Sequence, residues 1–256
     1  MDTILHTTDN ARSDNDATVP SNMKTVLIGA LPPMQGLQVL YDFVTGEEET
    51  LLIQQLDRCH WAGKGIEPNP EMKRRHQHYG GVFSYRLRRV VGDMEPLPSM
   101  FDFLTRRLLN QRIYSQSPNS IIVNEYEAGQ GIMPHVDAPK LFGSTITALS
   151  LLSDCIMSFQ HVKEADLIYR IYLPRRSLVV MNGSCRYDYK HSISKDLVEY
   201  VDGLEIVRTR RVSITYRDML VDDKNATEDG TKSMSCRSSC GRTCNNTTSG
   251  STTIGK

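Results

Sequence analysis

Three side chains in this sequence have the types and spacing of a metal site. His135 and Asp137 are two residues apart, so on an extended segment both leave the same face, as two ligands of one ion must. His191 lies in RYDYKHSI, far enough along the chain to belong to another strand. Two imidazoles and one carboxylate form the facial triad of non-haem Fe(II) oxygenases, whose open positions accept a keto acid and dioxygen. Zinc is the competing metal, because this ligand set also suits a hydrolytic site.

Two arginines further along the chain would supply the charge that a keto acid needs. On an extended RVSITYR segment, the residues that share one face are Arg211, Ser213, Thr215 and Arg217. A dicarboxylate such as 2-oxoglutarate offers two groups, each able to accept charge-assisted hydrogen bonds from a planar guanidinium. The alternative is an ordinary solvated strand face with both arginines in water.

The elements that must position these residues are short strands. From Ser120 onward, runs with a period of two are separated by turn residues: SIIVNEY, TITALSLL, CIMSFQ, LIYRIYL, SLVVMNG, YKHSI, LEIVRTR and VSITYR. Short strands at this spacing favour an antiparallel double sheet. The sequence therefore predicts a mainly β fold with some α, a double-stranded β-helix (jelly roll) with helices packed on one face.

The helices are expected before this region. GLQVLYDFVT predicts a strand, and the capping pair Thr45 and Glu48 predicts a helix directly after it. A second helix is expected after Pro98. The residues expected to face inward are Leu52, Ile53 and Leu56 in the first helix and Met100, Leu104 and Leu108 in the second.

Length and composition favour one domain. With 256 residues and 39 % hydrophobic composition, the chain can bury one sizeable core. We expect this domain to span residues 25–220, between polar segments 1–24 and 221–256 that are expected to be disordered. The second of these segments contains Cys236, Cys240 and Cys244, which are either spare thiols or metal ligands.

Charge and cysteine usage indicate the environment. Thirty basic and thirty acidic side chains cancel, so binding to nucleic acid requires a local patch. No apolar run could serve as a secretory signal or a membrane span. Cys59, Cys155 and Cys185 lie in or beside apolar segments and suggest buried thiols of a reducing compartment. We expect a cytoplasmic or nuclear protein that does not bind membranes and is a monomer.

Several motifs in order resemble one known family. They are Asn124-Glu-Tyr126, then Gly129, Gly131, Pro134, His135 and Asp137, then LPRRSLVVMNG, RYDYKHSI and RVSITYR. Their order and spacing over residues 36–217 are similar to those of the AlkB dioxygenases. The resemblance implies an enzyme that uses Fe(II), with 2-oxoglutarate and O2 as co-substrates.

The resemblance also implies a role for particular residues. His135, Asp137 and His191 would bind iron. Arg211 with Tyr126 would hold the distal carboxylate of 2-oxoglutarate, and Arg217 with Asn124 would lie near its metal-side carboxylate. Ser213 stands where the bacterial family member has asparagine and similar eukaryotic members have serine.

Arg186 and Tyr189 lie on the approach to His191. They either orient the metal ligands from outside or serve as edge and core packing.

The segment from Lys73 to Arg89 is rich in basic and aromatic residues and contains no acidic residue. This composition suits phosphate contact and base stacking, and the segment resembles the nucleotide-recognition lid of AlkB enzymes. The residues expected to bind substrate are Arg74, Arg75, Tyr79, Phe83 and Tyr85. The alternative is a basic edge hairpin whose alternate aromatic residues belong to the core.

The substrate expected from this resemblance is a modified nucleic-acid base, hydroxylated or oxidatively demethylated, in RNA and most specifically in tRNA. HQHYGGVFSY is most similar to a eukaryotic family member that hydroxylates a modified wobble uridine in tRNA. The alternatives are repair of alkylated DNA, hydroxylation of a protein, and a catalytically idle AlkB-like module that only binds a partner.

Overall fold

The computed structural model describes residues 23–25, 32–84, 86–87, 89–91 and 94–220. The sequence predicts disorder in residues 1–24 and 221–256. Of these, residues 1–22 and 221–256 lie outside the described residues, and Met23 and Lys24 belong to strand β1 (Met23–Thr25). Tyr85, Cys236, Cys240 and Cys244 also lie outside the described residues.

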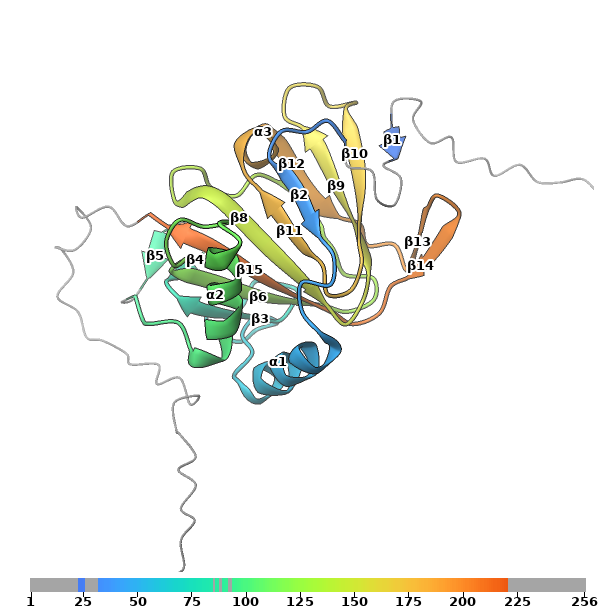
Figure 1. Ribbon diagram of the computed structural model, residues 1–256. Coiled ribbons are helices and arrows are strands. Elements are labelled where there is room, and N and C mark those ends of the chain that lie inside the picture. Colours follow the sequence, from blue (N-terminus) through green and yellow to red (C-terminus); the bar gives the residue numbers. More distant parts are fainter. Residues whose placement is uncertain (1–22, 26–31, 85, 88, 92–93, 221–256) are drawn as a thin grey trace, which may run out of the picture.

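Two sheets form the body of the protein (Figure 1). The six-stranded sheet has the order β2 (Leu37–Leu40), β11 (Leu178–Met181), β8 (Phe142–Leu151), β15 (Arg211–Met219), β6 (Ser120–Tyr126) and β3 (His76–Gly80). The five-stranded sheet has the order β1 (Met23–Thr25), β10 (Ile168–Leu173), β9 (Cys155–His161), β12 (Tyr189–Ile193) and β7 (Ile132–His135). The strand pairs in both sheets are antiparallel except for β1 with β10. This confirms the predicted antiparallel double sheet.

The helices cover the outer face of the six-stranded sheet. They are α1 (Gly46–Arg58), the 3-10 turn η1 (Ser99–Phe101) and α2 (Asp102–Asn110). Thr45 and Glu48 form the predicted capping box at the start of α1. The side chains of Leu52, Leu56, Leu104 and Leu108 are buried against the sheet, and those of Ile53 and Met100 are partly buried there. The predicted packing of helices on one face is therefore confirmed.

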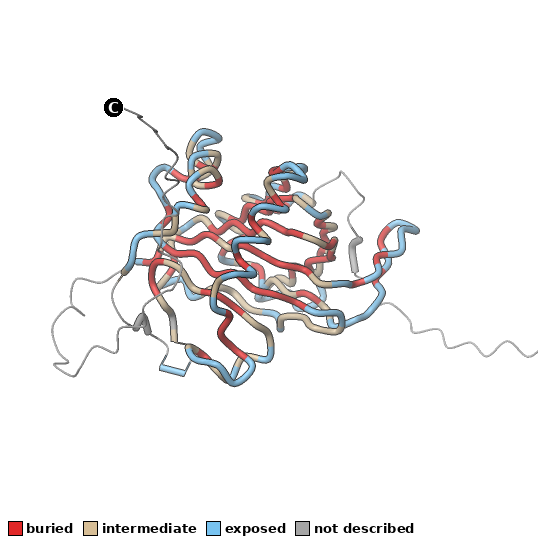
Figure 2. The backbone as a smooth tube through the Cα atoms, turned by 90° about the horizontal axis from the view of Figure 1, so that it is seen from below, coloured by how far each residue is buried: buried red, intermediate tan, exposed pale blue. Residues whose placement is uncertain are grey.

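Side-chain alternation in the strands separates two regions of core. In β15, Val212, Ile214 and Tyr216 join the cluster under the helices. A second cluster, which includes Met157 and Phe159, lies between the sheets. Figure 2 shows buried residues along both sheets and exposed residues at the ends of loops. The residues of β15 between those three therefore face the space between the sheets, as the predicted alternation requires.

Some elements differ from the sequence prediction. LEIVRTR contributes a strand to neither sheet, because β14 (Leu204–Val207) pairs only with β13 (Val198–Val201) in a projecting hairpin (Figure 1). A second hairpin joins β4 (Val82–Ser84) to β5 (Arg89–Val91), and a short helix, α3 (Gly183–Tyr187), precedes β12. Cys155 and Cys185 are buried free thiols as expected, whereas Cys59, at the end of α1, is only partly buried. No helix in the described part of the chain is long and apolar enough to cross a membrane.

Candidate active site

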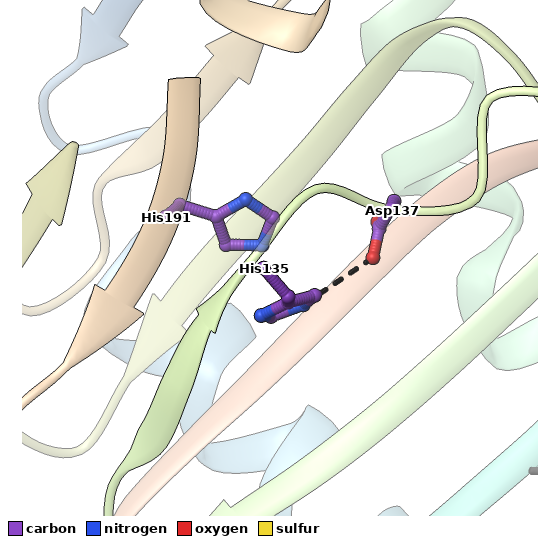
Figure 3. Close-up of side chains that lie close together, drawn as sticks. All are labelled: His135, Asp137 and His191. Carbon is purple, nitrogen blue, oxygen red and sulfur yellow. Dashed lines mark ion pairs between the residues drawn. The ribbon is translucent and has the colours of Figure 1, made fainter. Parts of the chain in front are cut away.

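His135, Asp137 and His191 come together at one end of the space between the sheets (Figure 3). His135 ends β7 and His191 lies in β12, and the two residues are direct partners in that strand pair. Asp137 follows in the loop after β7, with its Oδ1 atom 3.4 Å from His135 Nε2. One potential ligand atom from each of the three residues lies within 4.8 Å of the others. The sequence-predicted triad is therefore assembled with a geometry that could hold one metal ion.

The protein environment prepares the three groups to act as metal ligands. The Nδ1 atom of His135 is 2.9 Å from the carbonyl oxygen of Met133, and this contact orients the ring with Nε2 toward Asp137. Burial lowers the pKa of His191 to about 4, which leaves this imidazole neutral at pH 7. Burial alone would raise the pKa of Asp137, but the hydrogen bond with His135 and the charge of Arg217 hold that pKa well below its usual range.

Arg186 holds the loop that carries Asp137. This arginine is 3 % exposed, and its Nη1 atom donates to the carbonyl oxygen of Asp137 at 2.8 Å. It also donates to the carbonyl oxygens of Phe142 and Gly143, where β8 begins. Of the two roles considered from the sequence, these contacts favour orientation of a metal ligand. Tyr189 instead packs in the core, with its ring 5.0 Å from that of His161.

Arg211 is fully buried at the inner face of the six-stranded sheet. Its Nη2 atom donates to Ser150 Oγ at 2.7 Å, and its guanidinium lies 5.5 Å from the ring centroid of Tyr126. The Nε and Nη1 atoms have no hydrogen-bond partner among the described residues. A buried guanidinium with unpaired N–H groups is costly, so this position favours an anion and argues against the solvated strand face.

Arg217 presents a second such group nearer the triad. Its Nη1 atom is 4.0 Å from Asp137 Oδ2, and its guanidinium lies 3.9 Å from the ring centroid of Phe142. The Nε and Nη2 atoms of Arg217 have no hydrogen-bond partner within the described ranges. Two buried guanidiniums with spare donors thus face one space, one of them beside the triad.

One cavity is lined by the residues that were predicted from the sequence to bind the metal and the co-substrate. Its lining includes the triad together with Asn124, Tyr126, Arg211, Ser213 and Arg217. Ile132, Ile146, Ala148, Met157 and Met181 supply apolar walls. A small polar molecule bound there would therefore touch the metal ligands, both arginines and an apolar surface at once.

Two groups that position residues of this site were not predicted from the sequence. Ser150 accepts a hydrogen bond from Arg211 and so positions it. In the sequence, the alternation of TITALSLL is the only signal of the face on which Ser150 lies. The carbonyl oxygen of Met133 positions His135, and a backbone contact leaves no signal in residue types.

The segment predicted as a nucleotide lid divides between two faces of β3. Arg74 lines the cavity, where its Nε atom donates to Asn124 Oδ1 at 2.9 Å. Arg75 points the other way, forms an ion pair with Glu125 at 2.6 Å and lies over the ring of Trp61. Tyr79 packs edge-to-face against Phe101 under the helices. The sequence prediction of substrate contact therefore does not fit Arg75 or Tyr79, because a strand sends successive side chains to opposite faces.

The two remaining residues of that prediction have no described side-chain contacts. Phe83 lies in β4, where its backbone pairs with Val90. Tyr85 lies outside the described residues.

Comparison with known proteins agrees with this site. A profile described as the 2OG-Fe(II) oxygenase superfamily matches residues 36–217. An uncharacterised protein, L905, of Acanthamoeba polyphaga mimivirus is 32 % identical over 192 residues, which are 73 % of this chain and 86 % of the viral protein. A Xenopus tropicalis protein named tRNA (carboxymethyluridine(34)-5-O)-methyltransferase alkbh8 is 32 % identical over 215 residues, 76 % of this chain.

The chain spans only 33 % of that frog relative's length. Among solved structures, that of OsALKBH1 matches with a TM-score of 0.54 at 14 % identity, covering 73 % of this chain and all of that one, which shows a shared fold. A Bos taurus protein named alpha-ketoglutarate-dependent dioxygenase alkB homolog 7, mitochondrial, is 31 % identical over 181 residues, which are 68 % of this chain and 74 % of that protein. Since the superfamily profile also matches residues 36–217, the chain belongs to the AlkB family of 2-oxoglutarate-dependent Fe(II) dioxygenases.

Proposed function

We propose that this enzyme hydroxylates or oxidatively demethylates a modified base in RNA, most specifically in tRNA. The observation that carries the chemical part is the cavity in which the His-Asp-His group lies beside two buried arginines with unpaired donors. The RNA part is supported by the frog relative, whose name describes a tRNA uridine as its substrate.

The triad fits Fe(II). In this proposal His135 Nε2, a nitrogen of His191 and a carboxylate oxygen of Asp137 bind the ion and leave positions open for 2-oxoglutarate and O2. Arg186 keeps Asp137 in place through its backbone carbonyl. When bound, Fe(II) and these co-substrates supply the oxidation of a C–H bond. A hydroxylated N-methyl group is then lost as formaldehyde, whereas a carbon not attached to nitrogen keeps its hydroxyl.

The arginines fit the two carboxylates of 2-oxoglutarate. Arg211 and Tyr126, which face each other in the β15–β6 register, would hold the carboxylate that is distant from the metal. Arg217 and Asn124 would lie near the carboxylate on the metal side, since Arg217 is the arginine next to Asp137. Ser213 pairs with Asn124 in the same register and lies between the two ends.

The proposal is tested by succinate formation from 2-oxoglutarate, with purified protein and Fe(II). RNA and DNA oligonucleotides of one sequence, carrying the same modified base, are compared with an extended peptide. We expect the RNA to stimulate succinate formation most and to gain a hydroxyl or lose a methyl group by mass spectrometry. Faster turnover of the DNA would redirect the assignment to alkylation repair, and stimulation by the peptide alone would indicate a protein hydroxylase. Absence of turnover with a bound metal would indicate an idle module.

A further inference from the structure

Arg74, which precedes β3, lines the cavity but belongs neither to the triad nor to the residues assigned to the co-substrate. His76 and His78 follow on β3, where they pair with Asn124 and Ile122 of β6. Neither histidine lines the cavity, and the ring nitrogens of both are buried. Arg74 is therefore the side chain of this segment that a bound molecule could reach.

The opposite face of β3 has only structural contacts. Arg75 is paired with Glu125, and the side-chain amide of Gln77 donates to the carbonyl oxygen of Leu56 in α1. Tyr79 packs against Phe101. The two arginines of this segment therefore have different roles: Arg75 stabilises the outer face, and Arg74 is available to a ligand in the cavity.

The two carboxylates of 2-oxoglutarate would pair with Arg211 and Arg217, so the guanidinium of Arg74 has no carboxylate partner from the co-substrate. Arg211 and Arg217 have the buried unpaired N–H groups, and each matches one carboxylate of 2-oxoglutarate. Arg74 is only half-buried, and its bond to Asn124 uses Nε. Its two terminal nitrogens, the pair that binds oxyanions side by side, are left for another molecule.

The charges around the cavity restrict the substrate further. Arg74, Arg211 and Arg217 all line it, and Asp137 is the one carboxylate among its described lining residues. That carboxylate is already engaged with His135. Because the two carboxylates of 2-oxoglutarate would pair with Arg211 and Arg217, Arg74 is the positive side chain of the lining that remains for the substrate, and it would attract a group that carries an oxyanion.

We propose that Arg74 is a substrate-positioning residue that binds an oxyanion of the modified nucleotide. This inference rests on the proposed function and names the kind of substrate group that Arg74 would bind. The oxyanion is either a carboxylate on the base or a neighbouring phosphate, since both present the same paired oxygens to a guanidinium.

The test is RNA binding by full-length protein loaded with Mn(II) and a non-reacting analogue of 2-oxoglutarate, measured by fluorescence anisotropy. Four single-stranded RNAs of one sequence differ only in the central nucleotide. It is 5-carboxymethyluridine, the methyl ester of that base, 5-methyluridine or the cationic 1-methyladenine. Arg74→Gln is compared with Arg75→Gln, which changes the neighbouring arginine on the opposite face.

We expect Arg74→Gln to weaken binding of the carboxymethyl RNA about 10- to 100-fold, as for one lost charge-assisted contact. A loss confined to that RNA identifies the base carboxylate as the oxyanion. An equal loss for all four RNAs, with a salt dependence lower by about one unit, identifies a phosphate. Arg75→Gln is expected to lower the melting temperature and leave the affinity of the folded protein unchanged.

Two results separate the inference from the function on which it rests. If the wild-type protein binds RNA and Arg74→Gln binds it equally well but needs more 2-oxoglutarate for turnover, Arg74 belongs to the co-substrate and the inference is wrong. If the wild-type protein consumes 2-oxoglutarate but binds none of the RNAs, the proposed RNA substrate is itself wrong.

Discussion

His135 of β7 and His191 of β12 lie directly opposite each other across an antiparallel strand pair, with ring centroids 4.3 Å apart. Strand register, and not closeness in sequence, brings these two imidazoles together. A shift of one residue in β12 would turn His191 to the other face of the sheet. β12 also pairs with β9, which places Phe159 opposite His191 and fixes that register from the second side.

Removal of one imidazole should abolish metal binding and turnover while the fold remains. Loss of a residue that only hydrogen-bonds to a metal ligand typically lowers metal affinity about 10- to 100-fold. His191→Ala removes a ligand itself, so we expect a larger loss of Fe(II) affinity. Metal titration and succinate formation measure the effect, and circular dichroism checks the fold. His60→Ala changes an exposed histidine and serves as the control. Full activity in His191→Ala would exclude this residue as a ligand.

Arg186 should influence the metal without touching it. Lysine at this position keeps the charge but cannot donate to the carbonyl oxygens of Asp137, Phe142 and Gly143 together, as the guanidinium does. We expect Arg186→Lys to lower Fe(II) affinity about 10- to 100-fold, with little change in the half-saturating 2-oxoglutarate concentration once metal is in excess. Metal affinity equal to that of the wild type would assign Arg186 to packing alone.

The sequence was most informative where side chains alternate with a clear period. The residues of β15 show this, because apolar Val212, Ile214 and Tyr216 indicate which face is covered and so where Arg211 and Arg217 point. The expected antiparallel double sheet follows from the same signal.

The sequence was least informative where polar residues occupy both faces of a strand. In RRHQHYG no apolar alternation distinguishes Arg74, at the cavity, from Arg75, at the outer face. Only the pairing of β3 with β6 makes that distinction, and such a pairing joins segments far apart in the chain.

The packing of α1 on the sheet predicts very different effects for two neighbouring leucines. Leu52 is 1 % exposed and Leu51 is 57 % exposed. Leu52→Ala leaves a cavity in the cluster under the helices and should lower the free energy of unfolding by about 2–5 kcal/mol. Leu51→Ala should stay within about 0.5 kcal/mol of the wild type. Urea unfolding measures both, and equal losses would contradict the orientation of α1.

The co-substrate site predicts a specific defect for Arg211→Lys. Lysine offers a point charge in place of the planar fork, so a loss of about 1.5–3 kcal/mol is expected in 2-oxoglutarate binding, or about 10- to 150-fold in half-saturation. Arg210→Lys is the matched control, because that arginine faces outward and pairs with Asp57. If both variants need the same concentration of 2-oxoglutarate as the wild type, Arg211 does not bind it.

The ion pairs of Glu125 should contribute to the free energy of unfolding in a way that depends on pH. Its side chain is 2 % exposed and pairs with Arg75 at 2.6 Å and with Arg210 at 2.8 Å. Burial alone would raise the pKa of this carboxyl, but the two arginines outweigh burial and lower it from its ordinary value of 4.5.

Since the folded-state pKa of Glu125 lies below the unfolded one, its contribution is complete above pH 4.5 and is lost as the pH falls through the folded-state value. We therefore expect the stability difference between the wild type and Glu125→Gln to be constant from about pH 7 to about pH 5 and to shrink below that. Urea unfolding across this range measures it. Glu127→Gln removes an exposed carboxylate paired with Lys64 and provides the control. A difference for Glu125→Gln that is independent of pH would mean that the arginines do not favour its ionised form.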